Sequence, residues 1–172
     1  MRSRISNGRS ETEVFIIPTP PEDQRTQEMR FWLSVLRVHN TIFPELNKSL
    51  RDNAGVGLAK FDVLAQLVRN PNGITMGDLS TALKVTNGNV SGLVNRLIKD
   101  GLVSRKMSET DRRSFSVMLT EQGLATFHKA LAFHKSTLAE ALADVERDTL
   151  TEATEPLRHL AVRPQPALVQ GK

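Results

Sequence analysis

The sequence predicts a mainly α-helical protein with one small β-hairpin, and three observations support this fold class. Apolar residues recur at spacings of three and four over most of the chain, as they do along one face of a helix. The periodicity changes to strict alternation only between residues 102 and 119, around a polar, charged turn. Aromatic residues make up only 5% of the 172 residues and tyrosine is absent, so the core must rely on Leu, Val and Ala.

The composition excludes several classes of protein. No cysteine is present, which rules out a disulfide framework and any thiolate metal site. No run approaches the roughly 20 apolar residues of a membrane span. The apolar run at residues 14–17 is also too short for a signal peptide. We therefore expect a soluble, intracellular protein.

Charge is unevenly distributed along the chain. The formal net charge is +4. Residues 84–113 include seven basic and three acidic residues, whereas residues 140–158 include six acidic and two basic ones. A basic middle and an acidic end indicate a polarised molecule with one face suited to polyanions.

The N-terminal part of the chain is predicted to be an arm followed by a long helix. Residues 1–21 are polar and end in a proline-rich stretch, so we expect a flexible arm. Residues 22–57 form the next region, which is dominated by one amphipathic helix. Pro44 removes a helical hydrogen bond, and we expect a kink or a break near Ile42 and Phe43.

The middle region, residues 58–120, contains two short helices on either side of a tight turn, followed by two strands. A first helix is expected over residues 58–70. Thr75 caps the next helix, with Asp78 placed three residues later as in a capping box. Thr86 caps a further helix that ends at Gly101 and buries a stripe made of Val90, Leu93, Val94 and Leu97. Strands are expected over residues 102–107 and 114–119.

The C-terminal region, residues 121–162, is predicted to hold two more helices, followed by a tail over residues 163–172. The first of these helices should turn a set of apolar residues inward: Leu124, Phe127, Leu131, Phe133, Leu138 and Leu142. The second contains Pro156, which a helix tolerates near its start or at a kink.

The order short helix, turn, helix and hairpin predicts a winged helix-turn-helix flanked by helices at both ends. In such a unit the second helix enters the major groove, which is wide enough for a helix. Here its exposed side is hydrogen-bonding or small; Asn can pair with adenine and Arg with guanine. Gly88 and Gly92 each lower helix propensity by about 1 kcal/mol, but they let the backbone approach closely. The alternative is an ordinary solvated face, which usually carries Glu and Lys instead.

The predicted turn between the strands carries two adjacent arginines. Arg112 and Arg113 lie where a wing reaches the flanking minor groove, whose negative potential attracts arginine. Asp111 could direct one of them through a salt bridge, although an ordinary charged turn remains the alternative. The candidate DNA-binding residues are therefore Thr75, Thr86, Asn87, Gly88, Asn89, Ser91, Asn95, Arg96, Lys99, Arg105, Asp111, Arg112 and Arg113.

The stretch from residue 61 to residue 123 resembles the MarR family of bacterial regulators. The resemblance is carried by the combined spacing of residues 89–97 (NVSGLVNRL), 100–105 (DGLVSR) and 111–114 (DRRS). It implies a homodimer joined through regions 22–57 and 121–162, and a pseudo-palindromic double-stranded operator with half-sites about one helical turn apart. It further implies repression relieved by a small ligand, in the bacterial cytoplasm at the nucleoid.

The resemblance also implies a ligand site between the dimerisation helices and the DNA-binding domain. In this sequence that site would include Trp32, Leu36, Arg37, His39, Asn40, Phe61, Leu64 and Phe115. A core, interface or surface role is the alternative for each of them. Residues 85–90 (VTNGNV) look like members that sense aromatic acids or hydroxycinnamoyl-coenzyme A thioesters, so a small aromatic acid or aromatic acyl-CoA is the expected effector. The urate-sensing branch is less similar, because Leu93 stands where that branch has arginine.

Two other classes of function are alternatives. An enzyme is not expected, because the sequence contains no nucleophile elbow, phosphate loop or paired carboxylates. The four histidines do not cluster in sequence either, and no cofactor or metal is implied. The second alternative is a winged helix that binds protein without specific DNA. Salt dependence separates the two, since DNA binding weakens steeply as salt rises.

Overall fold

The computed structural model describes residue 21, residues 26–107 and residues 115–161. The predicted arm (apart from Pro21), the predicted tail and residues 108–114 lie outside these ranges. The chain divides into two compact units, residues 1–38 and residues 39–172. The described part of the first unit is Pro21, Thr26 and the beginning of the first helix, and every other element belongs to the second unit.

Helix α1, Gln27–Ala54, continues without interruption through Pro44. Of the kink or break expected near Ile42 and Phe43, the break is therefore wrong. Proline removes only one backbone donor, and the turns after it are held because Leu46 and Leu50 are buried. The helix ends at Gly55, which has a φ of +71° and donates its N–H to the Arg51 carbonyl at 3.1 Å.

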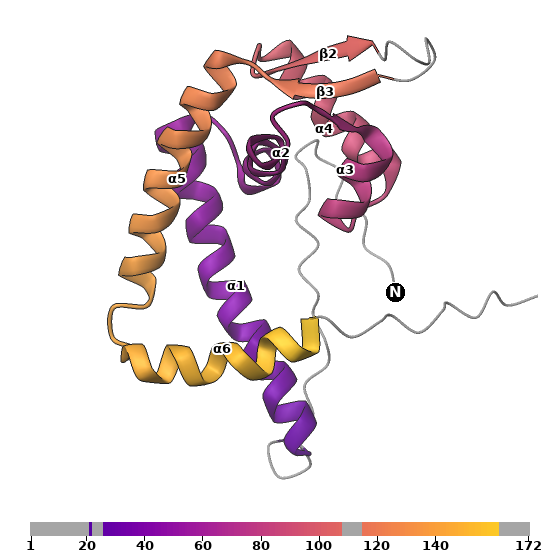
Figure 1. The fold of residues 1–172 in the computed structure, drawn as a ribbon. Coiled ribbons are helices and arrows are strands. Elements are labelled where there is room, and N and C mark those ends of the chain that lie inside the picture. Colours follow the sequence, from indigo (N-terminus) through magenta and orange to yellow (C-terminus); the bar gives the residue numbers. More distant parts are fainter. Residues whose placement is uncertain (1–20, 22–25, 108–114, 162–172) are drawn as a thin grey trace, which may run out of the picture. The chain divides into compact units, whose positions relative to one another are not determined.

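Helix α2, Leu58–Arg69, lies at the centre of the second unit. Its buried residues include Phe61, Val63, Leu64 and Leu67. Figure 1 shows α2 between α5 on one side and the pair α3 and α4 on the other, and it contacts all three helices. The Asn47 side chain accepts a hydrogen bond from the N–H of Leu58 at 3.0 Å, which ties the start of α2 to α1.

The sheet of the second unit has three antiparallel strands in the order β1-β3-β2. Strands β2, Val103–Met107, and β3, Phe115–Leu119, form the predicted hairpin. Strand β1, Ile74–Thr75, pairs with β3 and was not expected. Two residues are too few to display an alternating pattern. The strand directly follows Gly73, whose φ of +91° lies in the region that favours glycine.

Helices α3, Met76–Leu83, and α4, Asn87–Lys99, form the predicted helix-turn-helix. The N-cap at Thr75 is confirmed, because its hydroxyl accepts from the N–H of Asp78 at 3.2 Å. The Asp78 carboxylate accepts from the Thr75 hydroxyl at 2.7 Å, in place of the backbone N–H that completes a capping box. The turn places Lys84 in the left-handed region at a φ of 54°, and the Ser80 hydroxyl donates to the Val85 carbonyl at 3.0 Å. Thr86 occupies the N-cap of α4 as expected, but its side chain makes no capping hydrogen bond.

Helices α5, Glu121–Ala141, and α6, Arg147–Ala161, complete the second unit. Phe127 is buried as predicted, but Leu124 is 41% exposed, so its inward assignment is wrong. The buried stripe of α5 runs through Gly123, Phe127 and Ala130, which places residue 124 on its flank. Helix α6 continues through Pro156 and buries none of its own residues within the described chain. None of the described helices combines the length and the apolar character needed to cross a membrane.

Gly123 allows the first turn of α5 to pack against the chain that follows α4. A Cβ at this position would overlap the carbonyl oxygen of Leu102 and lie 2.9 Å from its carbonyl carbon. We expect Gly123→Ala to destabilise the protein by about 3 kcal/mol, because backbone atoms must move to make room. The free energy of unfolding in urea measures this change.

Gly77 in the first turn of α3 provides a matched control. A Cβ there would meet only the Thr75 hydroxyl oxygen, at 3.9 Å. Gly77→Ala should therefore leave the stability unchanged or raise it by up to about 1 kcal/mol. Equal unfolding midpoints for the two variants would contradict the packing described for Gly123.

Candidate functional site

One side of helix α4 is fixed firmly to the core of the second unit. Val90, Val94 and Leu97 are fully buried along that side. The C-terminal end of the helix is held by an ion pair of 2.5 Å between the Lys60 ammonium on α2 and the Asp100 carboxylate. Figure 1 shows α4 beside the hairpin, and α4 contacts strand β2 of that hairpin.

The opposite side of α4, called here the open face, carries small and hydrogen-bonding residues. Its members are Gly88, Asn89, Ser91, Gly92, Asn95, Arg96 and Lys99, all exposed except the half-buried Gly92. No acidic residue occurs in α4. Thr86 is exposed at the N-cap, and Asn87 begins the helix with its side chain outside the described structure. The open face can donate and accept hydrogen bonds and carries only positive charge.

The two glycines of the open face have no packing role inside the protein. A Cβ on Gly88 would meet no atom within 4 Å, and a Cβ on Gly92 would meet only the mobile end of Arg96, at 3.7 Å. Each glycine nevertheless weakens the helix by about 1 kcal/mol relative to alanine. Nothing within the described chain requires either glycine.

Asn95 and Arg105, both candidate DNA-binding residues, contact one another. The Arg105 guanidinium on β2 donates to the Asn95 side-chain oxygen at 2.6 Å. The same guanidinium lies 4.4 Å from the ring centre of Phe115 on β3. Sequence reasoning missed this contact, because ten residues and a change of secondary structure separate Asn95 from Arg105.

The remaining candidate DNA-binding residues fall into two groups. Thr75 is exposed, but its hydroxyl is already hydrogen-bonded to the first turn of α3. It accepts from the N–H of Asp78 and donates to the Asp78 carboxylate at 2.7 Å. Asp111, Arg112 and Arg113 lie outside the described residues, as does the salt bridge expected for Asp111. Their assignment stays a prediction.

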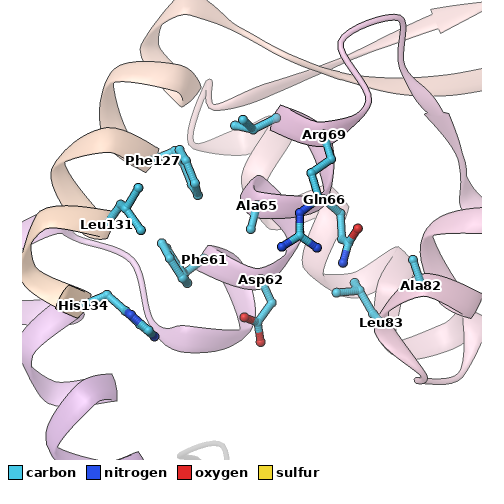
Figure 2. A pocket seen from close by; sticks show the side chains of 11 residues that line it. Phe61, Asp62, Ala65, Gln66, Arg69, Ala82, Leu83, Phe127, Leu131 and His134 are labelled. Carbon is cyan, nitrogen blue, oxygen red and sulfur yellow. The ribbon is translucent and has the colours of Figure 1, made fainter. Parts of the chain in front are cut away.

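A cavity of about 550 Å³ lies between α2, α3 and α5. Figure 2 shows aromatic and aliphatic side chains from α2 and α5 on one side of it and the end of α3 on the other. The Phe61 ring stacks between two rings of α5, with centroid distances of 5.5 Å to Phe127 and 5.0 Å to His134. The lining residues are Phe61, Asp62, Ala65, Gln66, Val68, Arg69, Ala82, Leu83, Phe127, Leu131 and His134.

The polar groups of this cavity come mostly from one helix. Asp62, Gln66 and Arg69 project from α2, and His134 projects from α5. Partial burial raises the pKa of the Asp62 carboxyl above its ordinary value, and the nearby His134 opposes that shift. Across the part of the chain that the structure describes, no three His, Asp or Glu side chains gather as metal ligands.

Five of the eight candidate ligand residues lie in the second unit, and of these only Phe61 lines the cavity. Leu64 is fully buried in the core, Phe115 packs against Arg105, and His39 and Asn40 are not among the lining residues. Trp32, Leu36 and Arg37 belong to the first unit, and their assignment stays a prediction. Trp32 is 51% exposed, and the His39 ring stacks on Phe43 at 5.0 Å.

Sequence reasoning missed most of the cavity wall. The signal was present in the spacing, because Phe61, Ala65 and Arg69 recur every four residues on α2 and Phe127, Leu131 and His134 recur at four and three on α5. Apart from Phe61, which was a candidate ligand residue, both series were assigned to the core or left unassigned. Only the packing of α2 against α5 shows that they face a common space.

The helix-turn-helix, the attached hairpin and the open face of α4 define a winged-helix DNA-binding protein. Residues 54–114 match the model of the MarR family. The chain is 51% identical to a MarR family regulator from Silicibacter pomeroyi, whose crystal structure superimposes with a TM-score of 0.69. The match covers 78% of this chain and 92% of that regulator. It is also 33% identical over 125 residues to an HTH-type transcriptional regulator of Bacillus cereus, which spans 70% of this chain and 82% of the relative.

The chain therefore belongs to the MarR family of DNA-binding transcriptional regulators and is not an enzyme. The resemblance drawn from residues 89–97, 100–105 and 111–114 is confirmed at the level of the family. The fold also matches that of Sco3205, a MarR family regulator from Streptomyces coelicolor solved in complex with DNA. That match has 23% identity and a TM-score of 0.73, and it covers 82% of this chain and 95% of the other.

The glycines of the open face generate a first prediction for this site. Gly88→Ala and Gly92→Ala should raise the melting temperature, because alanine is the better helix former and space is available. Each should also weaken binding to duplex DNA on the order of tenfold, because a methyl group separates the backbone from the DNA. Gly77→Ala is the matched control, with raised stability and unchanged DNA affinity. Parental DNA affinity in the Gly88→Ala and Gly92→Ala double variant would contradict the assignment.

Asp62 generates a second prediction, which concerns pH. Because its pKa is raised in the folded protein, the native state binds the proton more tightly than the unfolded chain. The contribution of Asp62 to stability is therefore greatest in acid. It falls as the pH rises from 3.8, the ordinary pKa of the carboxyl, through the raised pKa of the folded protein. Asp62→Asn should stabilise the protein at pH 7 by less than about 1 kcal/mol, since much of Asp62 remains exposed and water screens its carboxyl.

The difference between Asp62→Asn and the parent protein should shrink as the pH falls through the ordinary pKa of 3.8 and become negligible about one unit below it, where the parent carboxyl is protonated in both states. Melting temperatures of the two proteins between pH 3 and pH 7 measure it. A difference that grows toward acid would mean that the carboxylate is stabilised by His134 more than it is penalised by burial.

Proposed function

We propose that the protein is a homodimeric repressor that binds a pseudo-palindromic operator and is released from it by a small aromatic ligand. The observation that carries the DNA-binding part is the open face of α4, which contains two glycines without an internal role. The major groove, about 12 Å wide, admits a helix of this kind. Asn89 and Arg96 are exposed on it and would contact base edges, while Lys99 would contact a phosphate.

The predicted wing extends this surface. Arg112 and Arg113 would reach the minor groove beside the half-site, with Asp111 directing one of them. The seven basic residues among residues 84–113 support an attraction to the phosphate backbone that weakens as salt rises.

The dimer is proposed from apolar residues that the second unit leaves uncovered. Helix α6 buries no residue of its own in the described chain, and Leu157 and Leu160 on it are 41% and 45% exposed. A second copy of the chain would cover these side chains, with regions 22–57 and 121–162 as the dimerisation helices around the DNA-binding region 58–120. Two-fold symmetry then presents two copies of α4 to a palindromic site.

The effector is proposed to bind in the cavity between α2, α3 and α5. Its volume of about 550 Å³ lies within the range of roughly 300–1,000 Å³ for small-molecule sites. The stacked rings of Phe61, Phe127 and His134 favour a planar aromatic ligand. Arg69 supplies a cation for a carboxylate, so an aromatic acid, or the aromatic end of an acyl-CoA thioester, is the proposed class.

The cavity adjoins the turn that leads into α4, which suggests how a ligand would release DNA. Ala82 and Leu83 line the cavity at the end of α3, and α4 begins at Asn87. The bond from the Ser80 hydroxyl to the Val85 carbonyl keeps this connection short and stiff. A ligand that displaces α3 would therefore displace α4. Affinity for ligand and affinity for DNA must then oppose each other reciprocally.

Thermal-shift screening of aromatic acids and their CoA thioesters tests this proposal. A hit should raise the melting temperature and lower the affinity for duplex DNA enriched from a randomised library. Ala65→Leu places extra volume in the cavity and should abolish both effects while DNA affinity stays at the parental value. Ala132→Leu, at an exposed position of α5 outside the cavity lining, is the matched control.

Two results would contradict the proposal in different ways. A ligand that acts equally on Ala65→Leu and on the parent protein would place the effector elsewhere. A ligand that stabilises the protein without lowering DNA affinity would exclude release as the mode of regulation.

A further inference from the structure

A single guanidinium connects the open face of α4 to the hairpin. Arg105 donates to the Asn95 side-chain oxygen at 2.6 Å, and its guanidinium carbon lies 4.4 Å from the ring centre of Phe115. Arginine in this position has two separate restraints, a hydrogen bond at one edge and an aromatic ring against its plane. The guanidinium is therefore held in a defined orientation next to the helix that faces outward.

The position of Arg105 in the sheet explains why it reaches α4. It lies opposite Val117 in the β2–β3 register, two residues along from Val103. Val103 and Val117 are buried, whereas Met107 at the far end of β2 is 62% exposed. Along β2 this side of the hairpin therefore passes from the core to solvent between residues 103 and 107. Arg105 occupies the transition and meets the edge of α4 at Asn95.

The contact determines which way the Asn95 amide points. Arginine has only hydrogen-bond donors, so it must bind the amide oxygen and not the amide nitrogen. The oxygen end of Asn95 is thus directed to Arg105, and the NH₂ end is left for a partner. An asparagine that pairs with adenine uses both ends at once, accepting from N6 and donating to N7.

Guanine and adenine respond differently to an amide whose oxygen already accepts from Arg105. Guanine presents two neighbouring acceptors in the major groove, O6 and N7, and needs only the NH₂ group of Asn95. Adenine presents the acceptor N7 beside an NH₂ donor, and that donor would have to share the Asn95 oxygen with Arg105. Guanine is therefore the better match.

On the basis of the proposed DNA-binding function, we propose that Arg105 is a positioning residue that turns Asn95 into a reader of guanine in place of adenine. Phe115 supports Arg105 from the other side. The adenine pairing expected for asparagine from residue type alone is thus replaced at position 95. The adenine pairing expected for Asn89 is unaffected, because the bond from Arg105 goes to Asn95.

Selection from a randomised duplex DNA library, followed by sequencing, tests this inference. The base pair read by position 95 is the one whose preference disappears in Asn95→Ala. In the parent protein, guanine should exceed adenine there on the order of tenfold, as for one well-formed base contact. Arg105→Met keeps the stem over Phe115 but frees the amide, so the preference should move toward adenine. Arg105→Lys keeps a donor for the amide oxygen and should retain guanine.

Asn95→Asp provides an independent arm that leaves Arg105 in place. A carboxylate keeps the contact with Arg105, which should hold the melting temperature at or above the parental value, but it has no NH₂ group. Guanine preference should therefore disappear in this variant even if Arg105→Met proves unstable.

The outcomes separate this inference from the proposed function. If the parent protein enriches no sequence at all, the proposed DNA-binding function fails. If a sequence is enriched but no base pair depends on Asn95, the inference alone is overturned. It is overturned equally if adenine is preferred at that base pair in the parent, or if guanine is retained in Arg105→Met or Asn95→Asp.

Discussion

The burial of one side of α4 is the constraint on which the other features depend. Val90, Val94 and Leu97 are fully buried, and each such side chain stabilises the fold by about 1.5–3 kcal/mol relative to exposure. Because these residues are spaced by four and three positions along the sequence, they occupy one side of the helix and fix its rotation about its own axis. The remaining side is thereby committed to solvent or to a partner, which is why Gly88 and Gly92 can be retained although they weaken the helix.

Helix α2 links the two functional regions, because it supports α4 and also forms the wall of the cavity. Lys60 binds Asp100 at the end of α4, while Phe61 and Asp62, the next two residues, line the cavity. Helix α3 stands between these regions and leads directly into the turn before α4. A ligand in the cavity would therefore act on elements that already determine where α4 lies, with no need for a long pathway through the protein.

The sequence predicted those parts of the structure that depend on local patterns. The N-cap at Thr75, the left-handed end at Gly101 and the buried stripe of α4 follow from neighbouring residues. Features that depend on distant partners could not be predicted in the same way. Strand β1 needs the register of β3, the bond from Arg105 to Asn95 crosses from strand to helix, and the cavity needs the packing of α2 against α5. Helix α1 continues through Pro44 because later buried residues outweigh one missing donor.

Thiol-alkylation footprinting tests most directly whether the open face of α4 is the surface that meets DNA. The chain contains no cysteine, so a single introduced thiol reports one position without interference. Ser91→Cys places it on the open face and Ala125→Cys on an exposed part of α5. The account predicts that enriched duplex DNA slows alkylation at position 91 in proportion to the bound fraction and leaves the rate at position 125 unchanged. An unchanged rate at position 91 under saturating DNA would contradict it.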